Sequence, residues 1–416
     1  MTESLYFDAL IIGGGAAGCF LAAELARLSP SRSVAVVDAG DRTLKKVAIT
    51  GGGRCNLTNS FADISSLKEA YPRGDKLMRK CLSRFSHEDT WKWFTSNGVA
   101  LVLQEDRCVF PKSQDAMQIV RTLQNLMHKR GVSVFSGERV ERIIPVEGGF
   151  RVVPSGKNEF TCKALAVAPG GATPSILSML EGLPVRIEKP VPSLFTFKCP
   201  DPSLCALMGT VVENAALSIA GTKFSSKGPL LLTDWGMSGP AVLKLSSYAA
   251  RYLSENAYKC TAIVSWVGDG DRGEALSAIR GILESSPRKQ LRSVHPSCLS
   301  ARLWEYIVSK SGLRDDILCA EVGTKGLNRL VETLCADPVE VSGRARFKEE
   351  FVTCGGVSLK DVDPSTLQCR NLPGLFFAGE VLDVDAITGG FNLQAAWSTG
   401  FVAAGSMASF LEMPLQ

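Results

Sequence analysis

The feature that most constrains this chain is a glycine-rich turn between an apolar segment and a helical one near the N-terminus. Residues 6–12 (YFDALII) predict a buried strand, residues 19–28 (CFLAAELARL) a helix with an apolar face, and residues 34–37 (VAVV) a second buried strand. A strand, a helix and a further strand in this order form a βαβ unit, which implies a parallel sheet. The sequence therefore predicts an α/β fold.

The turn itself has the spacing of a dinucleotide-binding site. Gly13, Gly15 and Gly18 follow the pattern G-x-G-x-x-G, which allows a tight turn, a close approach to a pyrophosphate, and close packing of the helix on the strand. The N-terminus of the helix offers N–H groups and a partial positive charge to a phosphate. Asp38 ends the second strand, where a carboxylate accepts hydrogen bonds from a ribose, so NADP is disfavoured and NAD or FAD remains. The alternative interpretation is a purely structural turn.

A second glycine-rich segment near the C-terminus favours FAD. Residues 375–378 (LFFA) predict a buried strand, which is followed by Gly379 and by the acidic residues Glu380 and Asp383. If both chain ends build one domain, this turn lies beside the first, and Asp383 could accept hydrogen bonds from ribityl hydroxyls. The helix expected from about residue 393 would stabilise negative charge on a reduced flavin. The alternative is that these are ordinary turns that cap a strand and a helix.

The pattern of the sequence changes between about residues 190 and 345. Residues 191–267 contain short alternating strands, and residues 271–336 predict several helices. Before this region, residues 76–97 predict one long helix. A length of 416 residues also indicates more than one domain. We therefore predict a dinucleotide-binding domain, a β-rich insert and a helical insert, with the boundaries 1–190 and 346–416, 191–270, and 271–345.

Charge and cysteine content exclude several classes of protein. The chain has 46 Lys and Arg residues and 42 Asp and Glu residues. The resulting net charge of +4 does not indicate a protein that binds nucleic acid. The 13 cysteines include no Cys-x-x-Cys pair and there are only 3 histidines, so no metal site is predicted.

The many unpaired thiols favour a reducing compartment, so we expect the protein in the cytoplasm. We expect neither a signal peptide, because no basic region precedes the first apolar stretch, nor a membrane span.

Two segments together resemble those of a known family. Residues 48–59 (AITGGGRCNLTN) and 374–394 (GLFFAGEVLDVDAITGGFNLQ) are similar to the aminoacetone-oxidase-like, or BaiN-like, family of bacterial FAD-binding flavoproteins. Shorter matches at residues 109–113, 236–240 and 355–357 extend the resemblance over nearly the whole chain. The resemblance implies an FAD-binding Rossmann-type domain of the glutathione-reductase type, split by an insert with a β-barrel-like part and a helical part. No motif suggests a covalent link, so we expect non-covalent FAD.

The resemblance also implies which residues hold the cofactor. The ADP half would be held by the first turn and by the ends of nearby strands: Gly13, Gly15, Ala17, Gly18, Asp38, Val140 and Ala168. A second loop would wrap the pyrophosphate and the flavin side: Thr50, Gly51, Gly52, Arg54, Cys55 and Asn56. The C-terminal segment would hold the ribityl chain and the isoalloxazine ring: Gly379, Glu380, Asp383, Phe391, Asn392 and Leu393. One departure from the family pattern is Pro169, which lacks an N–H donor.

These observations predict an FAD-dependent oxidoreductase that acts on a small molecule by hydride transfer at the flavin. Oxidase or reductase direction, catalytic residues and oligomeric state remain unassigned. One dinucleotide fingerprint predicts no dedicated NAD(P) domain, although NAD(P)H could bind transiently. The alternative is a flavoprotein that modifies RNA or serves as a partner-bound redox module, which the near-neutral charge disfavours.

Two residues of the second loop leave further hypotheses open. Cys55 could act as a nucleophile beside the flavin, but no partner cysteine lies near it in the sequence, and a structural cysteine is the alternative. Arg54 could bind phosphate, stabilise reduced flavin, anchor an acidic substrate, or form a buried structural salt bridge.

Overall fold

The structure is a computed structural model, and it describes residues 4–156, 158–345 and 352–413. These residues fall into two compact units, of which the first runs to Val191 and resumes at Val352, and the second begins at Pro192. The boundary predicted at residue 346 lies among residues 346–351, outside the described residues.

The first unit is built on a seven-stranded sheet in the order β6-β2-β1-β9-β8-β7, with β19 pairing with β9 as well. The strands β6, β2, β1, β9 and β19 run parallel, and β8 and β7 are antiparallel additions. Buried apolar residues fill β1, β2 and β9, as expected for a sheet covered on both faces. The predicted α/β fold is confirmed. The bounds are β1 (Ser4–Ile12), β2 (Val34–Asp38), β6 (Ser133–Ser136), β7 (Val140–Val146), β8 (Gly149–Pro154), β9 (Glu159–Val167) and β19 (Leu375–Phe377).

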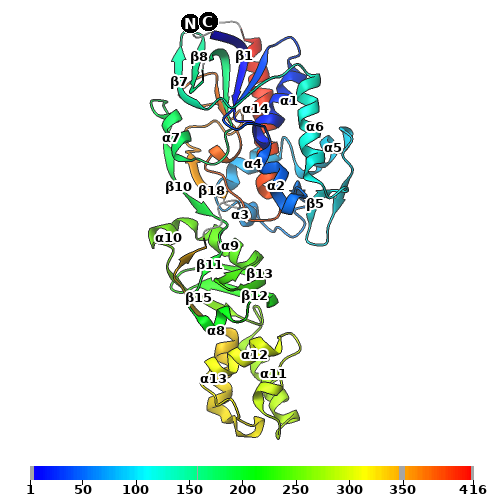
Figure 1. The fold of residues 1–416 in the computed structure, drawn as a ribbon, viewed down its shortest axis with the longest axis vertical. Helices are drawn as coiled ribbons and strands as arrows, with labels where there is room; N and C mark the ends of the chain where they lie inside the picture. The colour runs from blue at the N-terminus through cyan, green and yellow to red at the C-terminus, as the bar shows by residue number, and fades with distance from the viewer. Residues whose placement is uncertain (1–3, 157, 346–351, 414–416) are drawn as a thin grey trace. The chain divides into compact units, whose positions relative to one another are not determined.

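Helices from the two ends of the chain lie side by side in this unit. Figure 1 shows α14 (Phe391–Glu412) beside α1 (Ala16–Leu28), and a Cβ atom on Gly400 would lie 3.0 Å from the Ala17 carbonyl oxygen. The absence of a side chain at Gly400 therefore allows the two helices to approach closely. The other helices of the unit are α2 (Lys45–Gly53), α3 (Leu67–Ala70), α4 (Asp75–Leu82), α5 (His87–Ser96), α6 (Ala116–Lys129) and α7 (Pro174–Leu180).

The single helix predicted over residues 76–97 is wrong, because α4 and α5 are separate. Ser86 begins α5 with a capping box, in which its hydroxyl accepts the Asp89 N–H (3.2 Å) and the Asp89 carboxylate accepts the Ser86 N–H (2.9 Å). The periodicity of apolar residues continues across the break, so the pattern alone did not reveal it.

Two small sheets complete the first unit. The first is an antiparallel sheet in the order β3-β5-β4, and its first strand follows α2 in the chain. The second consists of β10 and β18. Their bounds are β3 (Thr58–Asn59), β4 (Leu101–Leu103), β5 (Cys108–Pro111), β10 (Ile187–Ser193) and β18 (Val352–Val357).

The second unit contains a seven-stranded sheet and its own apolar core, with Phe197, Trp266 and Trp304 fully buried. The sheet order is β16-β15-β12-β13-β14-β11-β17, and only Ser342 separates its two end strands along the chain. The strands are β11 (Phe197–Lys198), β12 (Val211–Ile219), β13 (Ser225–Thr233), β14 (Gly236–Ser238), β15 (Cys260–Ser265), β16 (Asp337–Val341) and β17 (Gly343–Arg344). The helices are α8 (Pro202–Cys205), α9 (Pro240–Tyr248), α10 (Ala250–Glu255), α11 (Arg272–Ser285), α12 (Ala301–Lys310) and α13 (Gly323–Cys335).

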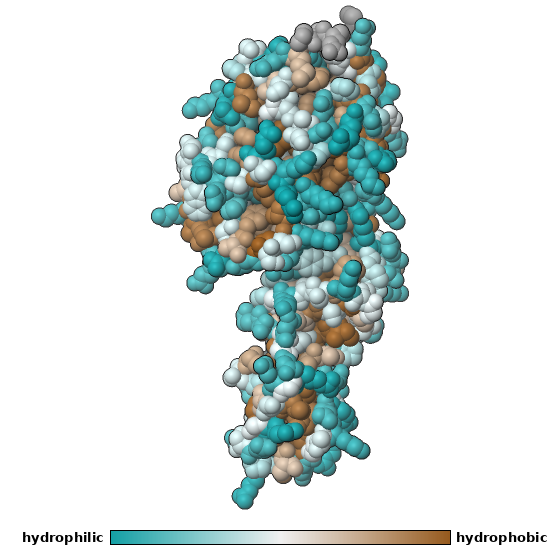
Figure 2. Space-filling model, turned by 180° about the vertical axis from the view of Figure 1, so that it is seen from behind, coloured by the Kyte–Doolittle hydropathy of each residue, from teal (hydrophilic) through white to brown (hydrophobic). Residues whose placement is uncertain are grey.

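Hydrophilic side chains cover much of each unit on the face seen in Figure 2, with hydrophobic patches scattered among them. Over the described part of the chain, no helix combines the length and the apolar character that crossing a membrane would require.

Candidate functional site

The three glycines of the first turn meet three different surroundings. Gly13 has a φ of +105°, and a Cβ there would lie 2.5 Å from the Pro169 Cα. A Cβ on Gly18 would overlap the Gly13 carbonyl oxygen, so α1 packs on the turn only because Gly18 has no side chain. At Gly15, by contrast, no described atom lies within 4 Å of a built Cβ. The turn is therefore closed at its two outer glycines and open at the middle one.

Asp38 holds the loop that follows β2 against this turn. One carboxylate oxygen accepts the Gly14 N–H at 2.6 Å, and the other accepts the Gly40 N–H at 2.7 Å. Each oxygen keeps a further lone pair, so Asp38 can both shape the loop and accept a ribose hydroxyl. The position of Asp38 at the end of β2 predicts the ribose contact. The bonds from the Gly14 and Gly40 N–H groups fix the orientation of its carboxylate.

The C-terminal glycine turn lies at the start of α1. The Ala168 N–H donates to the Ile12 carbonyl (2.8 Å) and the Ala378 N–H to the Val167 carbonyl (3.2 Å), so the carboxyl ends of β1, β9 and β19 are adjacent. A Cβ on Gly379 would lie 2.8 Å from the Ala17 Cβ. The two glycine turns expected to meet in space thus do meet, at the edge where ligands of open α/β sheets bind.

The second glycine-rich loop interrupts α2. Thr50 has an extended ψ of 148°, and Gly51, Gly52 and Gly53 follow with φ values of 57°, 68° and 81°. Among the described residues, no atom comes within 4 Å of a Cβ built on Gly52 or Gly53. Three left-handed positions in succession favour glycine, which has no Cβ to strain the backbone there. The open side at Gly52 and Gly53 therefore leaves room for a phosphate or a flavin edge to approach this loop.

The segment after this loop is tied to the turn before α14. The Asn59 Nδ2 donates to the Gly389 carbonyl at 3.0 Å, and the Thr58 hydroxyl donates to the Gln394 Oε1 at 2.5 Å. The Asn56 amide lies between the Thr58 carbonyl (3.1 Å) and the Gly390 N–H (3.2 Å), and bonds to both in its favourable orientation. These bonds bring two stretches of the predicted cofactor site together.

Several side chains implied by the resemblance are engaged inside the protein. Phe391 is buried with its ring 4.9 Å from that of Phe61, and the Asn392 amide bonds to the backbone of Ala386 (2.9 and 3.1 Å). Any contact from these two positions to a cofactor would thus come from the backbone at the start of α14. The Glu380 carboxylate accepts the Thr353 N–H (2.8 Å) and lies 3.8 Å from the Lys46 Nζ.

The remaining predicted positions lie on separate elements of the first unit. Asp383 is partly buried, and its N–H donates to the Val357 carbonyl at 3.0 Å. Val140 is buried at the start of β7, and Leu393 is partly exposed in the first turn of α14. The Thr50 hydroxyl donates to the Val47 carbonyl (2.8 Å). Their contacts with a cofactor stay predictions.

The buried ion pair between Arg73 and Asp385 was missed by the sequence analysis. Asp385 is fully buried and Arg73 is 12% exposed, and the guanidinium binds the carboxylate with both Nε (2.6 Å) and Nη2. The pair holds the chain after Asp383 against the loop before α4, where a Cβ on Gly74 would lie 2.5 Å from Val384. The sequence signal for this pair was the position of Asp385 among apolar residues, because a buried carboxylate needs a cationic partner.

Cys55 is unsuited to a thiol mechanism. It is fully buried, and burial raises the pKa of its thiol to about 12 although the Thr50 hydroxyl opposes the shift. A thiol with this pKa stays protonated at neutral pH and is a poor nucleophile. The hypothesis of a catalytic Cys55 loses its support.

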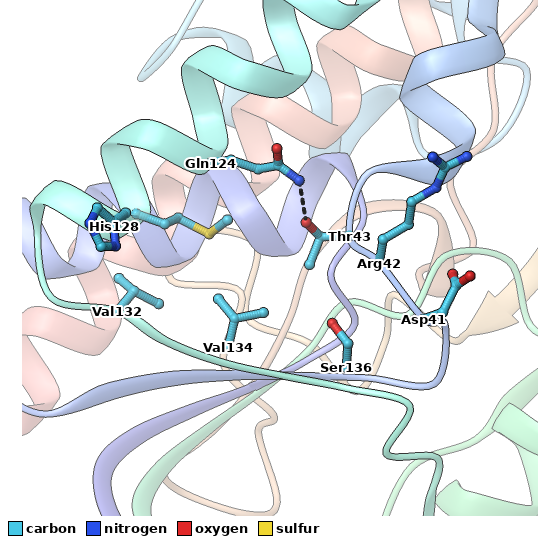
Figure 3. A pocket seen from close by; sticks show the side chains of 9 residues that line it. Asp41, Arg42, Thr43, Gln124, His128, Val132, Val134 and Ser136 are labelled. Carbon is cyan, nitrogen blue, oxygen red and sulfur yellow. Dashed lines mark hydrogen bonds between the residues drawn. The ribbon is translucent and has the colours of Figure 1, made fainter.

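A separate pocket of about 410 Å³ lies beyond the end of β2. Figure 3 shows the Gln124 amide of α6 bonded to the Thr43 hydroxyl (3.2 Å), with Asp41 and Arg42 at the opposite end from His128. Thr43 also faces the first turn, because its methyl group would lie 2.6 Å from a Cβ on Gly14. The pocket therefore borders the loop next to the predicted ADP site.

The residues present fit a bound dinucleotide. The open position at Gly15 lies at the N-terminus of α1, where no described side chain caps the helix and no acidic residue occupies its first turn. A pyrophosphate would meet free N–H donors and a favourable helix dipole there. The left-handed loop at residues 51–53 and the start of α14 would supply further backbone N–H groups.

Fold and site together define an FAD-binding Rossmann-type flavoprotein. Residues 7–406 match the model of the family described as HI0933-like protein Rossmann domain. The chain belongs to this family of flavin-dependent oxidoreductases, and the resemblance seen in the sequence is confirmed.

Similar proteins with curated names fall into two groups. The chain is 28% identical to a ribosomal RNA dihydrouridine synthase of Haemophilus influenzae (97% of this chain, 99% of the relative). It is 29% identical to the protein of that name in Escherichia coli (96% and 97%). It is 26% identical to a 3-dehydro-bile acid delta(4,6)-reductase of Clostridium scindens (94% and 97%).

Solved structures support the fold alone. The FrdA subunit of Escherichia coli quinol fumarate reductase superposes with a TM-score of 0.50 at 14% identity (98% of this chain, 71% of that chain). A 3-ketosteroid delta1-dehydrogenase from Sterolibacterium denitrificans gives the same score at 13% identity (97% and 99%).

Proposed function

We propose that this protein is an FAD-dependent reductase that adds hydrogen across a carbon–carbon double bond conjugated to a carbonyl group. The observation that carries the proposal is the meeting of the two glycine turns at the carboxyl ends of β1, β9 and β19, in a chain whose relatives are named for such reductions. Uracil in RNA and a 3-oxo bile acid with conjugated double bonds share this electron-poor bond.

In this proposal the two ends of the chain divide the work of holding FAD. The first turn would hold the pyrophosphate through Gly15 and the N-terminus of α1, and Asp38 would orient the adenosine ribose. The N–H groups at the start of α14 would face the flavin and favour negative charge on it. When bound and reduced by an external two-electron donor, FAD would supply a hydride to one carbon of the double bond and return to its oxidised form. The other carbon would take a proton from water or from an acidic group, so that the substrate gains two electrons and two protons in total.

The two groups of relatives favour two substrates. Uridine in ribosomal RNA is supported by two relatives that match nearly their whole length, although the net charge of +4 led us to expect no nucleic acid. A small unsaturated carbonyl compound, which is one kind of the unidentified small molecule that the sequence predicts, is supported by the third relative. NAD(P)H, which could bind transiently, is a candidate electron donor in either case.

We also infer that the first unit, extended over residues 1–190 and 346–416, is the FAD domain. We infer further that residues 191–270 form most of a barrel-like insert, and that residues 271–345 form a helical part whose last two strands, β16 and β17, return to the barrel. Support for the barrel comes from β16 and β17, which end opposite sides of the sheet and yet continue into one another through Ser342. The Ser342 N–H donates to the Lys198 carbonyl (2.8 Å), which maintains the pairing across that junction.

The test begins with the purified protein and its absorption spectrum. We expect a yellow protein that releases FAD on denaturation. After anaerobic photoreduction, the flavin should be reoxidised rapidly by an unmodified uridine-containing ribosomal RNA transcript or by a conjugated 3-oxosteroid, and slowly by oxygen. Reoxidation by RNA alone, with dihydrouridine detected by mass spectrometry, selects the first substrate. A colourless protein from flavin-replete cells, or fast reoxidation by oxygen only, contradicts the proposal.

A further inference from the structure

Arg54 is an exposed cation that the protein holds in one place. Its guanidinium carbon lies 4.5 Å from the centroid of the buried Phe110 ring, in cation–π geometry. Its Nε donates to the Gly51 carbonyl (3.2 Å), and its Nη1 approaches the Gln114 Oε1 (3.5 Å). A long surface side chain with these three contacts has given up much of its conformational freedom.

The partners of Arg54 leave its charge uncompensated. A ring face, a carbonyl and an amide are all neutral, and within the described ranges no carboxylate forms an ion pair with Arg54. Other exposed arginines nearby differ: Arg107 pairs with Asp63 (3.2 Å) and Arg121 lies 3.9 Å from Asp115. The structural salt bridge considered for Arg54 is therefore not present in the described part of the chain.

Left-handed backbone residues support this arrangement on both sides. Cys55, directly after Arg54, has a φ of 62°, and Gln114 has a φ of 54°. Neither is a glycine, so each position costs roughly 1 kcal/mol or more and persists only where the surroundings require it. The Gln114 amide is itself fixed by a bond from its Nε2 to the Pro111 carbonyl (3.1 Å). Backbone strain is thus present at the two positions that border the guanidinium.

Arg54 and the residues assigned to the pyrophosphate belong to different elements of the first unit. The pyrophosphate is assigned to Gly15 and the N-terminus of α1, whereas Arg54 lies over Phe110 of β5, in the three-stranded sheet that follows α2. Beside Arg54, the side of Gly52 and Gly53 is open over the described atoms. A second anion could therefore approach the guanidinium through this opening.

We propose that Arg54 is a specificity-determining residue that anchors an oxyanion of the substrate. The inference rests on the proposed function, because it assigns a binding role within the same site. The N–H groups of Arg54 that are not used by Gly51 and Gln114 can bind a phosphodiester or a carboxylate, which are the planar or tetrahedral oxyanions that arginine recognises best. Phe110 and Gln114 act as positioning residues that keep the guanidinium ready.

The experiment measures binding to the oxidised holoenzyme, so that it does not depend on turnover. The probes are a fluorescein-labelled decauridylate, for the phosphodiester, and cinnamate with its neutral analogue cinnamamide, for the carboxylate. The variants are Arg54→Gln, which removes the charge, and Arg54→Lys, which keeps it. Arg121→Gln, on the exposed face of α6, is the matched control.

We expect Arg54→Gln to weaken binding of one anionic probe about tenfold or more, as loss of a charge-assisted hydrogen bond implies. Arg54→Lys should recover part of it, and Arg121→Gln should leave it unchanged. Cinnamamide should bind all variants equally, and the FAD dissociation constant should not change.

Two results would overturn the inference. An equal loss of FAD affinity would make Arg54 a cofactor residue, and unchanged binding of both anions would remove its substrate role. Failure of the reduced enzyme to reduce both the ribosomal RNA transcript and the conjugated 3-oxosteroid would instead refute the proposed function, while the binding result stands.

Discussion

Asn59 and Gly389 are 330 positions apart in the chain, and the Asn59 Nδ2 donates to the Gly389 carbonyl oxygen at 3.0 Å. This bond joins β3, which follows the second glycine-rich loop, to the turn before α14. The Asn59 Oδ1 accepts the Phe61 N–H (2.9 Å), so both ends of the amide are used. The orientation of the α14 N-terminus thus depends on a residue near the other end of the chain.

Replacement of Asn59 by aspartate should loosen this junction. Asn59→Asp keeps the acceptor for Phe61 and removes the donor to Gly389, so we expect a loss of about 1–3 kcal/mol in the free energy of unfolding and a faster release of FAD. Urea denaturation and flavin fluorescence measure the two effects. Asn256→Asp, at an exposed helix end, is the control. An unchanged FAD release rate would show that the junction does not support the cofactor site.

Substitution of alanine for Gly15 and for Gly18 should separate cofactor binding from folding. At Gly18 the new Cβ would overlap the Gly13 carbonyl oxygen, so Gly18→Ala should destabilise the apoprotein. At Gly15 the apoprotein has room, so Gly15→Ala should keep the thermal midpoint of the apoprotein and lower FAD affinity. Gly405→Ala within α14 is the control, since its Cβ would meet no described atom within 4 Å. Normal FAD affinity in Gly15→Ala would place the pyrophosphate elsewhere.

Removal of the Asp385 carboxylate should be costly because it takes a charged hydrogen-bond partner away from the largely buried Arg73 guanidinium. We expect Asp385→Ala to lose about 3–5 kcal/mol of folding free energy, as is typical when one partner of a buried pair is removed. The exposed pair Arg121 and Asp115 is the comparison, where Arg121→Gln should cost less than about 1 kcal/mol because Asp115 keeps its capping bond to the Met117 N–H. Chemical denaturation measures both, and equal small losses would contradict the assignment.

Alkylation should distinguish buried from exposed cysteines. Because burial raises the pKa of Cys55 to about 12, its thiolate is scarce at pH 8, whereas Cys298 is exposed. Iodoacetamide should therefore modify Cys298 in the native protein and leave Cys55 intact, as read by peptide mass spectrometry. Early modification of Cys55, with loss of flavin turnover, would revive the thiol hypothesis.

The pair between Arg186 and Asp361 should make stability depend on pH in the acid range. Hydrogen bonds from Arg186 lower the pKa of Asp361, which accepts both the guanidinium and the Arg186 N–H (2.7 Å). A carboxylate with a lowered folded pKa contributes stability above its unfolded pKa, and loses it as the pH falls through the folded value. The difference in thermal midpoint between wild type and Asp361→Asn should thus be largest near pH 7 and shrink below about pH 4. A difference that grows in acid would exclude this cause.

The fold class and the family could be predicted because their signals are local. The strands before and after Gly13–Gly18 follow from runs of apolar residues, and the loops at residues 48–59 and 374–394 carry their motifs in the sequence itself. Periodicity did not show the break between α4 and α5, where the capping box of Ser86 and Asp89 outweighed a continuous apolar pattern. It also did not show that the Phe391 and Asn392 side chains are used within the protein.

The βαβ start, the need for glycine at the first turn and the membership in a flavoprotein family can be read from the sequence, because each depends on residues close together in the chain. The contacts between distant groups are seen only in the folded molecule: Asn59 with Gly389, Arg73 with Asp385, and Gly379 with Ala17. The folded molecule also shows that Arg54 lies on Phe110 without a counterion among the described residues, and that Cys55 is buried. The physical reason is that hydrogen bonding, burial and charge pairing depend on distances in space, and the order of residues fixes such distances only for near neighbours.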